Sequence, residues 1–249
     1  MNRPESPRFL DPRSADAEGI VQIGGQLSPQ WLLEAYSRGI FPWPIEFPQG
    51  HLLAWFSPDP RAILPWRNLH IPRRLMRRLR RSEFQFTSDR CFARVVAQCA
   101  APRRGEQSTW ITQEVFDAFV RFHELGYAHS IEVWQEGTLV GGLYGVAIGT
   151  LFCGESMFHR VRDASKAAVV ALCVHLDRQR FQLFDIQQAT SHMTRMGATE
   201  IARDDYLERL ARAVAVAGRF GTPGDFHRSC DVLAAAVRAG KMPWEEEVG

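Results

Sequence analysis

The chain has 249 residues, of which 45% are hydrophobic and 23% charged, and its formal net charge is +2. This length allows one large domain or two small ones. The longest apolar run, Ala167 to Val174, is much shorter than the roughly 20 residues that a membrane-spanning helix needs, which excludes such a helix. The polar residues 1–18 lack the apolar core of a signal peptide, and we interpret them as a flexible leader.

The cysteines indicate a reducing environment. They are odd in number and show no C-x-x-C spacing: Cys91, Cys99, Cys153, Cys173 and Cys230. This pattern supports neither a disulfide framework nor a structural zinc site. We therefore expect a cytoplasmic protein without a bound metal.

Residues 19–65 are predicted to form a small N-terminal domain. Ser28 and Pro29 fit the N-cap and first position of a helix, and Gly39 fits the cap at its end. Six prolines between residues 42 and 65 argue against long regular elements, whereas the aromatic residues among them argue against disorder. We therefore expect short strands after the helix.

A basic helix is predicted next. Ile71, Leu75 and Leu79 recur every four residues, which gives an apolar stripe at helical spacing. Arginines cover the rest of the circumference: Arg73, Arg74, Arg77, Arg78, Arg80 and Arg81. A solvated charged face is the simpler interpretation, but six arginines without an interleaved acid favour contact with nucleic-acid phosphates.

The remaining pattern predicts the fold class. From Thr112 the expected order is helix, three strands, helix, strand, helix, strand, helix, with strands at about 129–135, 139–147, 151–158, 181–187 and 200–201. This is an α+β (α/β layered) fold, with a mostly antiparallel sheet and flanking helices over residues 66–213. It is similar to the acetyltransferase-like (GNAT-like) fold. Residues 214–249 contain a further helical segment, for which no role is predicted.

Two strand segments carry candidate functional groups. Five glycines between Gly141 and Gly154 indicate a bulge or a close approach of a ligand or backbone. Glu155 follows in an apolar context, so it needs a partner, either a fixed basic residue or an incoming cation. On the later strand, Asp185 and Gln187 share one face because side chains alternate. This acid–amide pair can hold an amine or polarise a carbonyl.

Several strings together resemble the leucyl/phenylalanyl-tRNA–protein transferase family. They are SRGIFPW (37–43), WFSPDPR (55–61), TWIT (109–112), HSIEVW (129–134), the glycine run (141–158) and ASK (164–166). The resemblance covers roughly residues 20 to 210. It implies transfer of Leu, Phe or Met from aminoacyl-tRNA to proteins with an N-terminal Arg or Lys, which marks them for N-degron degradation. It implies no cofactor, neither ATP, metal nor CoA, and we expect a monomer.

The resemblance also assigns roles at the reaction centre. Gln187 would contact the attacking amine, and Asp185 would orient Gln187. Glu155, together with Gln187, would select the basic N-terminal residue. From the residues alone, Asp185 is also compatible with a buried acid that holds backbone N–H groups. Glu155 is equally compatible with a structural ion pair to Arg160 or Arg162.

The resemblance further implies an apolar pocket for the transferred side chain, with two tryptophans, Trp43 and Trp110, near the terminal adenosine of the tRNA. The predicted lining is Leu143, Phe152, Leu172, Leu176 and Phe184. Two of these positions are Leu where the family pattern has Phe, and Phe184 stands where it has Ile. Plain core packing is the alternative for each residue.

Three other functions compete with this interpretation. A CoA-dependent N-acetyltransferase shares the strand order, but the segment 159–165 lacks the glycine-containing pyrophosphate loop of that class. A noncatalytic nucleic-acid-binding module would use the arginines but leave the carboxylates and Gln187 unexplained. A transferase that feeds aminoacyl-tRNA into peptidoglycan or lipid shares the sheet type but lacks the strings above.

Overall fold

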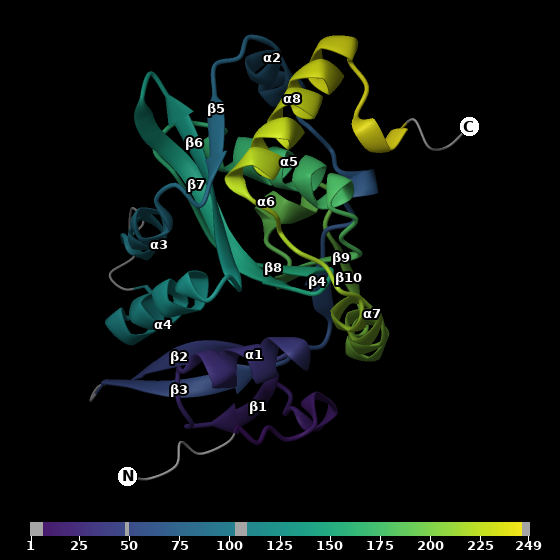
Figure 1. The fold of residues 1–249 in the computed structure, drawn as a ribbon. Helices are drawn as coiled ribbons and strands as arrows, with labels where there is room; N and C mark the ends of the chain where they lie inside the picture. The colour runs from purple at the N-terminus through teal and green to yellow at the C-terminus, as the bar shows by residue number, and fades with distance from the viewer. Residues whose placement is uncertain (1–6, 48–49, 103–108, 246–249) are drawn as a thin grey trace.

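Two β-sheets organise the chain in the computed structural model, which describes residues 7–47, 50–102 and 109–245 (Figure 1). The smaller, N-terminal sheet is antiparallel and has the order β1-β3-β2, with β1 (Ile20–Ile23), β2 (Phe41–Phe47) and β3 (Gly50–Phe56). Helix α1 (Pro29–Ser37) contacts β2. The hydroxyl of Ser28 caps α1 by accepting a hydrogen bond from the backbone N–H of Trp31, as the sequence predicts.

Two expectations for the N-terminal region are wrong. Strand β2 is seven residues long although it contains Pro42 and Pro44. Because β2 lies at the edge of its sheet, a missing N–H on the outer side breaks no ladder hydrogen bond. Residues 7–18 are not a loose leader, since Phe9 is buried and its ring packs edge-on against Trp31 and Trp55. A short 3₁₀ turn, η1 (Pro12–Ser14), follows.

The larger sheet has seven strands in the order β10-β4-β9-β8-β7-β6-β5. Their bounds are β4 (Arg61–Ile63), β5 (Gln85–Ser88), β6 (Ala128–Gln135), β7 (Thr138–Ile148), β8 (Leu151–His159), β9 (Leu183–Gln187) and β10 (Thr199–Ile201). All neighbours pair antiparallel except β8 and β9, which pair parallel. The expected fold class is therefore confirmed. Strand β4 belongs to this sheet although it lies within the segment 19–65.

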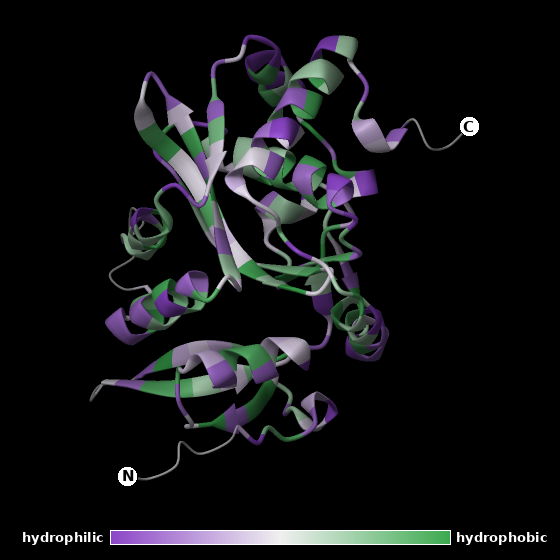
Figure 2. Cartoon of the chain, viewed as in Figure 1, coloured by the Kyte–Doolittle hydropathy of each residue, from purple (hydrophilic) through white to green (hydrophobic). Residues whose placement is uncertain are grey.

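Helices cover both faces of the larger sheet. Helix α5 (Ala164–Arg178) packs on β6, β7 and β8, and α3 (Phe92–Ala100) contacts the same strands. The neighbours Leu143 and Tyr144 of β7 belong to the two separate cores that contain α5 and α3, so these helices lie on opposite faces. Helix α4 (Gln113–Glu124) contacts α3 and β6, while α7 (Arg203–Ala215) packs beside β8 and β9. The strands are mostly hydrophobic, and the helices mix hydrophobic and hydrophilic residues (Figure 2).

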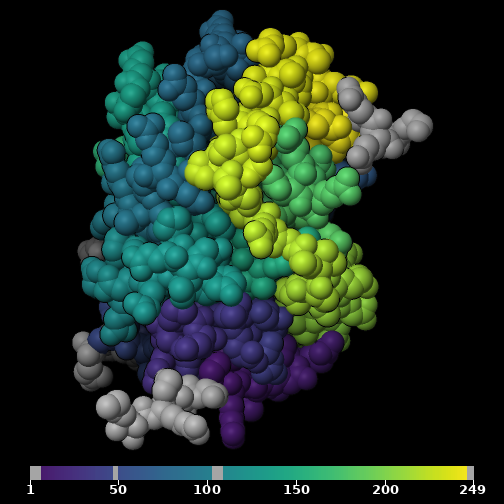
Figure 3. Space-filling model, viewed as in Figure 1, coloured from purple at the N-terminus to yellow at the C-terminus, as the bar shows by residue number. Residues whose placement is uncertain are grey.

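The C-terminal region packs against the larger domain. Helix α8 (Pro223–Ala239) contacts α5, β5 and the basic helix α2 (Arg73–Arg80), and it crosses the surface beside them (Figure 3). Within its contact with α5, the buried ring of His175 bonds the hydroxyl of Ser229 and the carbonyl of Phe220. The remaining short elements are η2 (Trp66–Asn68), α6 (Ser191–Thr194) and η3 (Pro243–Glu245). Among the described residues, no helix is long and apolar enough to cross a membrane.

Candidate active site

The candidate site lies where β8 and β9 stop pairing. Their parallel ladder ends at the pair Cys153 and Asp185, although both strands continue. A cavity of about 440 Å³ is lined by the residues beyond this point on both strands. The glycine run contains the predicted bulge, because the ladder between β7 and β8 shifts register at Gly145. A Cβ at Gly145 would lie 2.3 Å from the carbonyl oxygen of Cys153.

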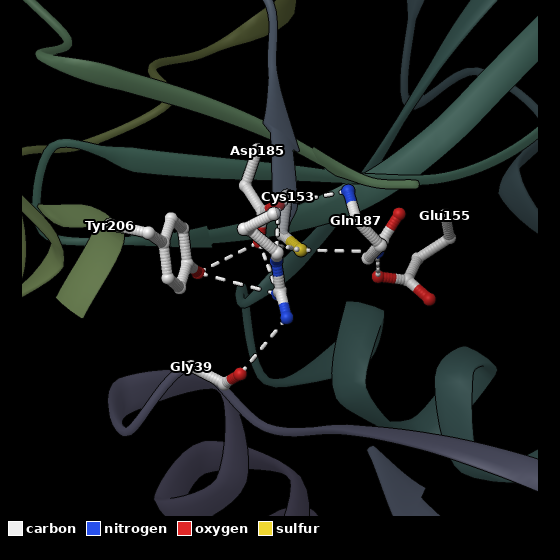
Figure 4. Close-up of polar contacts among 7 residues, drawn as sticks. Gly39, Cys153, Glu155, Asp185, Gln187 and Tyr206 are labelled. Carbon is white, nitrogen blue, oxygen red and sulfur yellow. Dashed lines mark hydrogen bonds and ion pairs between the residues drawn. The ribbon is translucent and has the colours of Figure 1, made fainter. Parts of the chain in front are cut away.

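Asp185 is the centre of a buried polar cluster (Figure 4). Its side chain is 0% exposed and accepts five hydrogen bonds. Arg61 donates from Nε to Oδ1 at 2.9 Å and from Nη2 to Oδ2 at 2.6 Å. The hydroxyl of Tyr206 at 2.8 Å and the thiol of Cys153 at 3.1 Å also donate to Oδ2. The backbone N–H of Gln187 donates to Oδ1 at 2.9 Å.

This environment fixes the charge of Asp185. Burial alone would raise the pKa of this carboxyl, but the charge and donors of Arg61 and the N–H of Gln187 bring the pKa below its usual value. Asp185 is therefore a permanent anion. It does not line the cavity, and its two oxygens are occupied by five donors, so its contacts fix the positions of its neighbours.

Arg61 joins this cluster to the N-terminal region. Its side chain is 1% exposed, and its Nη1 donates to the carbonyl of Gly39 at 3.1 Å. The guanidinium also lies over the rings of Phe41 and Tyr206, with its Cζ 4.9 and 4.4 Å from their centroids. The buried guanidinium of Arg61 thus contacts the turn after α1, the start of β2, strand β9 of the larger sheet, and α7.

Gln187 presents one specific atom to the cavity. It ends β9 with φ at 60°, a left-handed conformation that is rare outside glycine and frequent at functional sites. Its Nε2 donates to the Oε1 of Glu155 at 3.0 Å and to the sulfur of Cys153 at 3.2 Å. Because an amide nitrogen has only two hydrogens, Oε1 of Gln187 is the atom left to accept from a ligand.

Glu155 differs from Asp185 because its pKa is raised rather than lowered. It is partly buried beside the cavity, and burial together with the nearby negative charge of Asp185 raises its pKa to about 8, although the hydroxyl of Tyr36 lowers it. In the described ranges no Lys or Arg forms an ion pair with it. Arg160, one of its two possible structural partners, instead bonds the side chain of Gln98.

The structure divides the predicted pocket residues into two groups. Leu143 and Phe184 line the cavity, together with Met157, Val169 and Met193, which the sequence did not indicate. The other three predicted residues do not reach it, since each is 0% exposed in the core: Phe152, Leu172 and Leu176. Helical spacing identifies a shared face of α5, but only the first part of that face, at Val169, reaches the cavity.

The two predicted tryptophans meet at the edge of this cavity. Trp43 and Trp110 both line it, and their rings stack on each other with centroids 4.9 Å apart and planes 13° apart. Trp43 is 40% exposed. The pair therefore offers a large aromatic surface beside Glu155 and Gln187.

The arginines of α2 do not all have the same environment. Arg78 is half-buried, bonds Glu83 at 2.7 Å and lies over the ring of Phe84. Arg80 donates from Nε to the carbonyl of Val237 in α8. Arg80 is nevertheless exposed, as are the other four, Arg73, Arg74, Arg77 and Arg81. Arg74, Arg77, Arg78 and Arg81 also line a second cavity, of about 610 Å³, with Arg162.

Sequence reasoning missed the residues that support Asp185. Arg61 and Tyr206 come from segments far from Asp185 along the chain, and Cys153 lies in an apolar strand where a small hydrophobic residue is expected. One signal was present: Arg61 directly precedes the apolar residues 62–64. A charged residue in a buried strand requires a buried partner.

These features define a class of protein by its fold, a layered α+β protein whose seven-stranded mixed sheet opens at one cavity. The amide oxygen of Gln187 and the carboxyl group of Glu155, which has no cationic partner among the described residues, face this cavity. Among solved structures the chain is similar to a GCN5-related N-acetyltransferase-like protein from Streptococcus suis, at 14% identity over 69% of this chain and 64% of that one, with a TM-score of 0.29.

The chain belongs to the leucyl/phenylalanyl-tRNA protein transferase family. The model of that family matches residues 63–211, and the model of its N-terminal domain matches residues 25–59. The chain is 49% identical over 222 residues to the leucyl/phenylalanyl-tRNA–protein transferase of Nitratidesulfovibrio vulgaris (strain DP4), covering 88% of this chain and 94% of that one. It is 48% identical to the Aromatoleum aromaticum transferase, covering 95% and 96%. The predicted family is confirmed, and the chain is an aminoacyltransferase.

Proposed function

We propose that this protein transfers Leu, Phe or Met from aminoacyl-tRNA to the α-amine of proteins that begin with Arg or Lys. One observation carries the acceptor rule: Glu155 faces the cavity as a carboxyl group with a raised pKa and, within the described chain, without a cationic partner. A guanidinium or ammonium from the acceptor supplies the missing charge. Its arrival lowers the pKa of Glu155 and creates a charge-assisted hydrogen bond.

Gln187 handles the attacking amine. Its free Oε1 accepts one N–H of the neutral α-amine and directs the nitrogen lone pair at the ester carbonyl of the aminoacyl-tRNA. The new C–N bond replaces the ester C–O bond, and the terminal ribose oxygen leaves with a proton from the amine. Since an α-amine has a pKa near ~8, a substantial fraction is neutral without a strong base. Asp185, already saturated with donors, orients Gln187 and takes no proton.

The apolar part of the cavity receives the transferred side chain. Leu143, Met157 and Phe184 provide an apolar wall without a charged group, which suits Leu, Phe and Met. The terminal adenine stacks on the Trp43–Trp110 pair, a contact that is typically worth ~1–3 kcal/mol per base. The three fully buried residues of the earlier prediction support this wall from the core, as Phe152 does by packing edge-on against Phe184.

The exposed arginines of α2 bind the body of the tRNA. Arg73, Arg74, Arg77 and Arg81 are accessible, and the basic cavity beside them is bounded by Arg162. Arg162 follows β8, the strand that carries Glu155, so the basic surface and the reaction centre are connected by one rigid element. Phosphate contacts of this kind hold the acceptor stem while the aminoacyl end enters the cavity.

The cellular role follows from the acceptor rule. A protein that gains an N-terminal Leu, Phe or Met becomes a substrate of the N-degron pathway. All five cysteines are thiols, which supports a reducing cytoplasmic compartment. We propose that the enzyme acts there as a monomer.

The test mixes the purified protein with radiolabelled Leu-tRNA and a peptide that begins with Arg, beside an otherwise identical peptide that begins with Ala. Label on the Arg peptide alone is the expected result. Label on both peptides would contradict the role of Glu155. Binding of the tRNA without label on either peptide would favour a noncatalytic nucleic-acid-binding module.

A further inference from the structure

We infer that Cys153 and Arg61 are positioning residues that set the hydrogen-bond direction of Gln187, so that its amide oxygen rather than its nitrogen faces the acceptor amine. This inference rests on the proposed function, because it concerns the amine-binding atom of the same site. It depends on a chain of four groups in direct contact: Arg61, Asp185, Cys153 and Gln187.

Arg61 determines which groups donate and which accept along this chain of hydrogen bonds. A guanidinium has donors but no acceptor, and two of its nitrogens bond the two oxygens of Asp185. Asp185 therefore stays an anion and can only accept. Any group that contacts it must give it a hydrogen, as the hydroxyl of Tyr206 does.

Cys153 links Asp185 to Gln187 by donating to the first and accepting from the second. Its thiol touches Asp185 Oδ2 at 3.1 Å, so the S–H must point at that oxygen. Burial and the neighbouring carboxylates raise the pKa of Cys153 well above its ordinary value, so the thiol keeps this proton. Its sulfur then has only lone pairs on the side that faces Gln187, and it accepts from Nε2 at 3.2 Å.

Glu155 alone would not hold the amide in this orientation. An ionised Glu155 accepts from Nε2, but its pKa is about 8. Below that pH the carboxyl group carries a hydrogen and can donate to the amide oxygen, which would favour a flipped Gln187. When Glu155 is protonated, the ionised Asp185 is the stronger acceptor for the thiol hydrogen, so the sulfur of Cys153 presents its lone pairs to the amide. In that state the thiol therefore keeps the amide oxygen of Gln187 facing the acceptor amine.

The groups that face Glu155 and Gln187 come from several packed elements. Tyr36 lies on α1, Tyr144 on β7, Cys153 on β8, Asp185 on β9 and Arg61 on β4. Burial holds both tyrosine pKa values well above 10, and Arg61 stays charged. Glu155 is thus the group of this set whose charge changes near neutral pH.

The test compares Cys153→Ala with Cys153→Ser in the full-length protein. Loss of one directing hydrogen bond should lower kcat/KM for the Arg peptide about tenfold at pH 7. The dissociation constant for Leu-tRNA should change less than about twofold, because no tRNA contact is removed. The loss in kcat/KM, which reports the enzyme before the acceptor binds, should shrink above pH 8, where Glu155 is ionised. Serine keeps a donor and an acceptor, so Cys153→Ser should recover most of kcat/KM.

The matched control is Cys173→Ala, which truncates another fully buried cysteine, on α5 and outside the chain of contacts. It should lower the melting temperature like Cys153→Ala but leave kcat/KM unchanged. The inference is overturned if Cys153→Ser is as slow as Cys153→Ala, or if the loss does not depend on pH. Absence of transfer by the unmodified protein would instead remove the proposed function.

A double-mutant cycle tests the part of Arg61. Arg61→Lys keeps a buried cation but removes the paired donors to Asp185. If Arg61 and Cys153 act through the same chain, Arg61→Lys combined with Cys153→Ala should lower kcat/KM by less than the product of the two separate losses. Multiplicative losses would show that the two residues act independently.

Discussion

Arginine occurs in two contrasting regions of this molecule. Arg61 is buried between two rings and two carboxylate oxygens, whereas Arg73, Arg74 and Arg77 of α2 are exposed to solvent. Each of the three nitrogens of the buried guanidinium donates to a fixed partner, so this side chain controls geometry. The exposed ones have few fixed partners and are available to a ligand. The same side chain thus fixes the geometry of the candidate site in one region and, in the proposed function, contacts tRNA in the other.

The largest effect is expected from breaking the buried pair. Arg61→Met leaves the charge of Asp185 without its cation inside the protein, which should lower the free energy of unfolding by about 3–5 kcal/mol. Urea unfolding monitored by tryptophan fluorescence measures it. Arg77→Met, the exposed counterpart, should change the free energy by less than about 0.5 kcal/mol. Equal effects of the two substitutions would refute the contrast.

A similar contrast separates the apolar residues of the core from those that line the cavity. Leu172→Ala should cost about 2–5 kcal/mol of stability, because the residue is fully buried, without changing the ratio of Leu to Phe transfer. Leu143→Ala enlarges the cavity itself and should raise Phe transfer relative to Leu. Competition between Leu-tRNA and Phe-tRNA measures the ratio. A changed ratio in Leu172→Ala would instead place this residue in the pocket.

Glu155 lies between the two extremes, since in the proposed function its cationic partner arrives with the acceptor. As the pH rises through about 8, Glu155 becomes ionised, so the KM for the Arg peptide should fall between pH 6.5 and 9. In Glu155→Gln the charge is absent, and the KM at pH 9 should be about tenfold higher than in the unmodified protein. Its variation with pH should also become shallower. A pH dependence of KM that is identical in both proteins would exclude this role.

The smallest effect concerns single arginines of α2. Arg77→Gln should lower tRNA affinity a few-fold and reduce the slope of log affinity against log salt concentration by about 1. Arg78→Gln is the matched control, because Arg78 bonds Glu83 and covers Phe84. It should mainly lower the melting temperature. Filter binding at several salt concentrations separates the two, and an unchanged slope in Arg77→Gln would remove Arg77 from the tRNA surface.

The sequence predicts most elements but only part of the site. The helices at Ser28 and Arg73 and the strand of Asp185 and Gln187 follow from local caps and periodicity, and the structure contains all three. The residues that hydrogen-bond Asp185 could not be predicted in this way, because Arg61 is separated from it by 124 positions in the sequence. Similarly, the spacing of Leu172 and Leu176 gives their shared helix face but not the depth of the cavity beside it.

The position of β4 has a consequence for the timing of activity. This strand is inserted between β9 and β10, and Arg61 finds Tyr206 only 145 residues later in the chain. At synthesis rates of about 5–20 residues per second, roughly 7 to 30 seconds pass between the production of the cation and of its last partner. A nascent chain therefore holds Arg61 without its carboxylate until β9 is made. Aminoacyl transfer begins only after α7 has emerged from the ribosome.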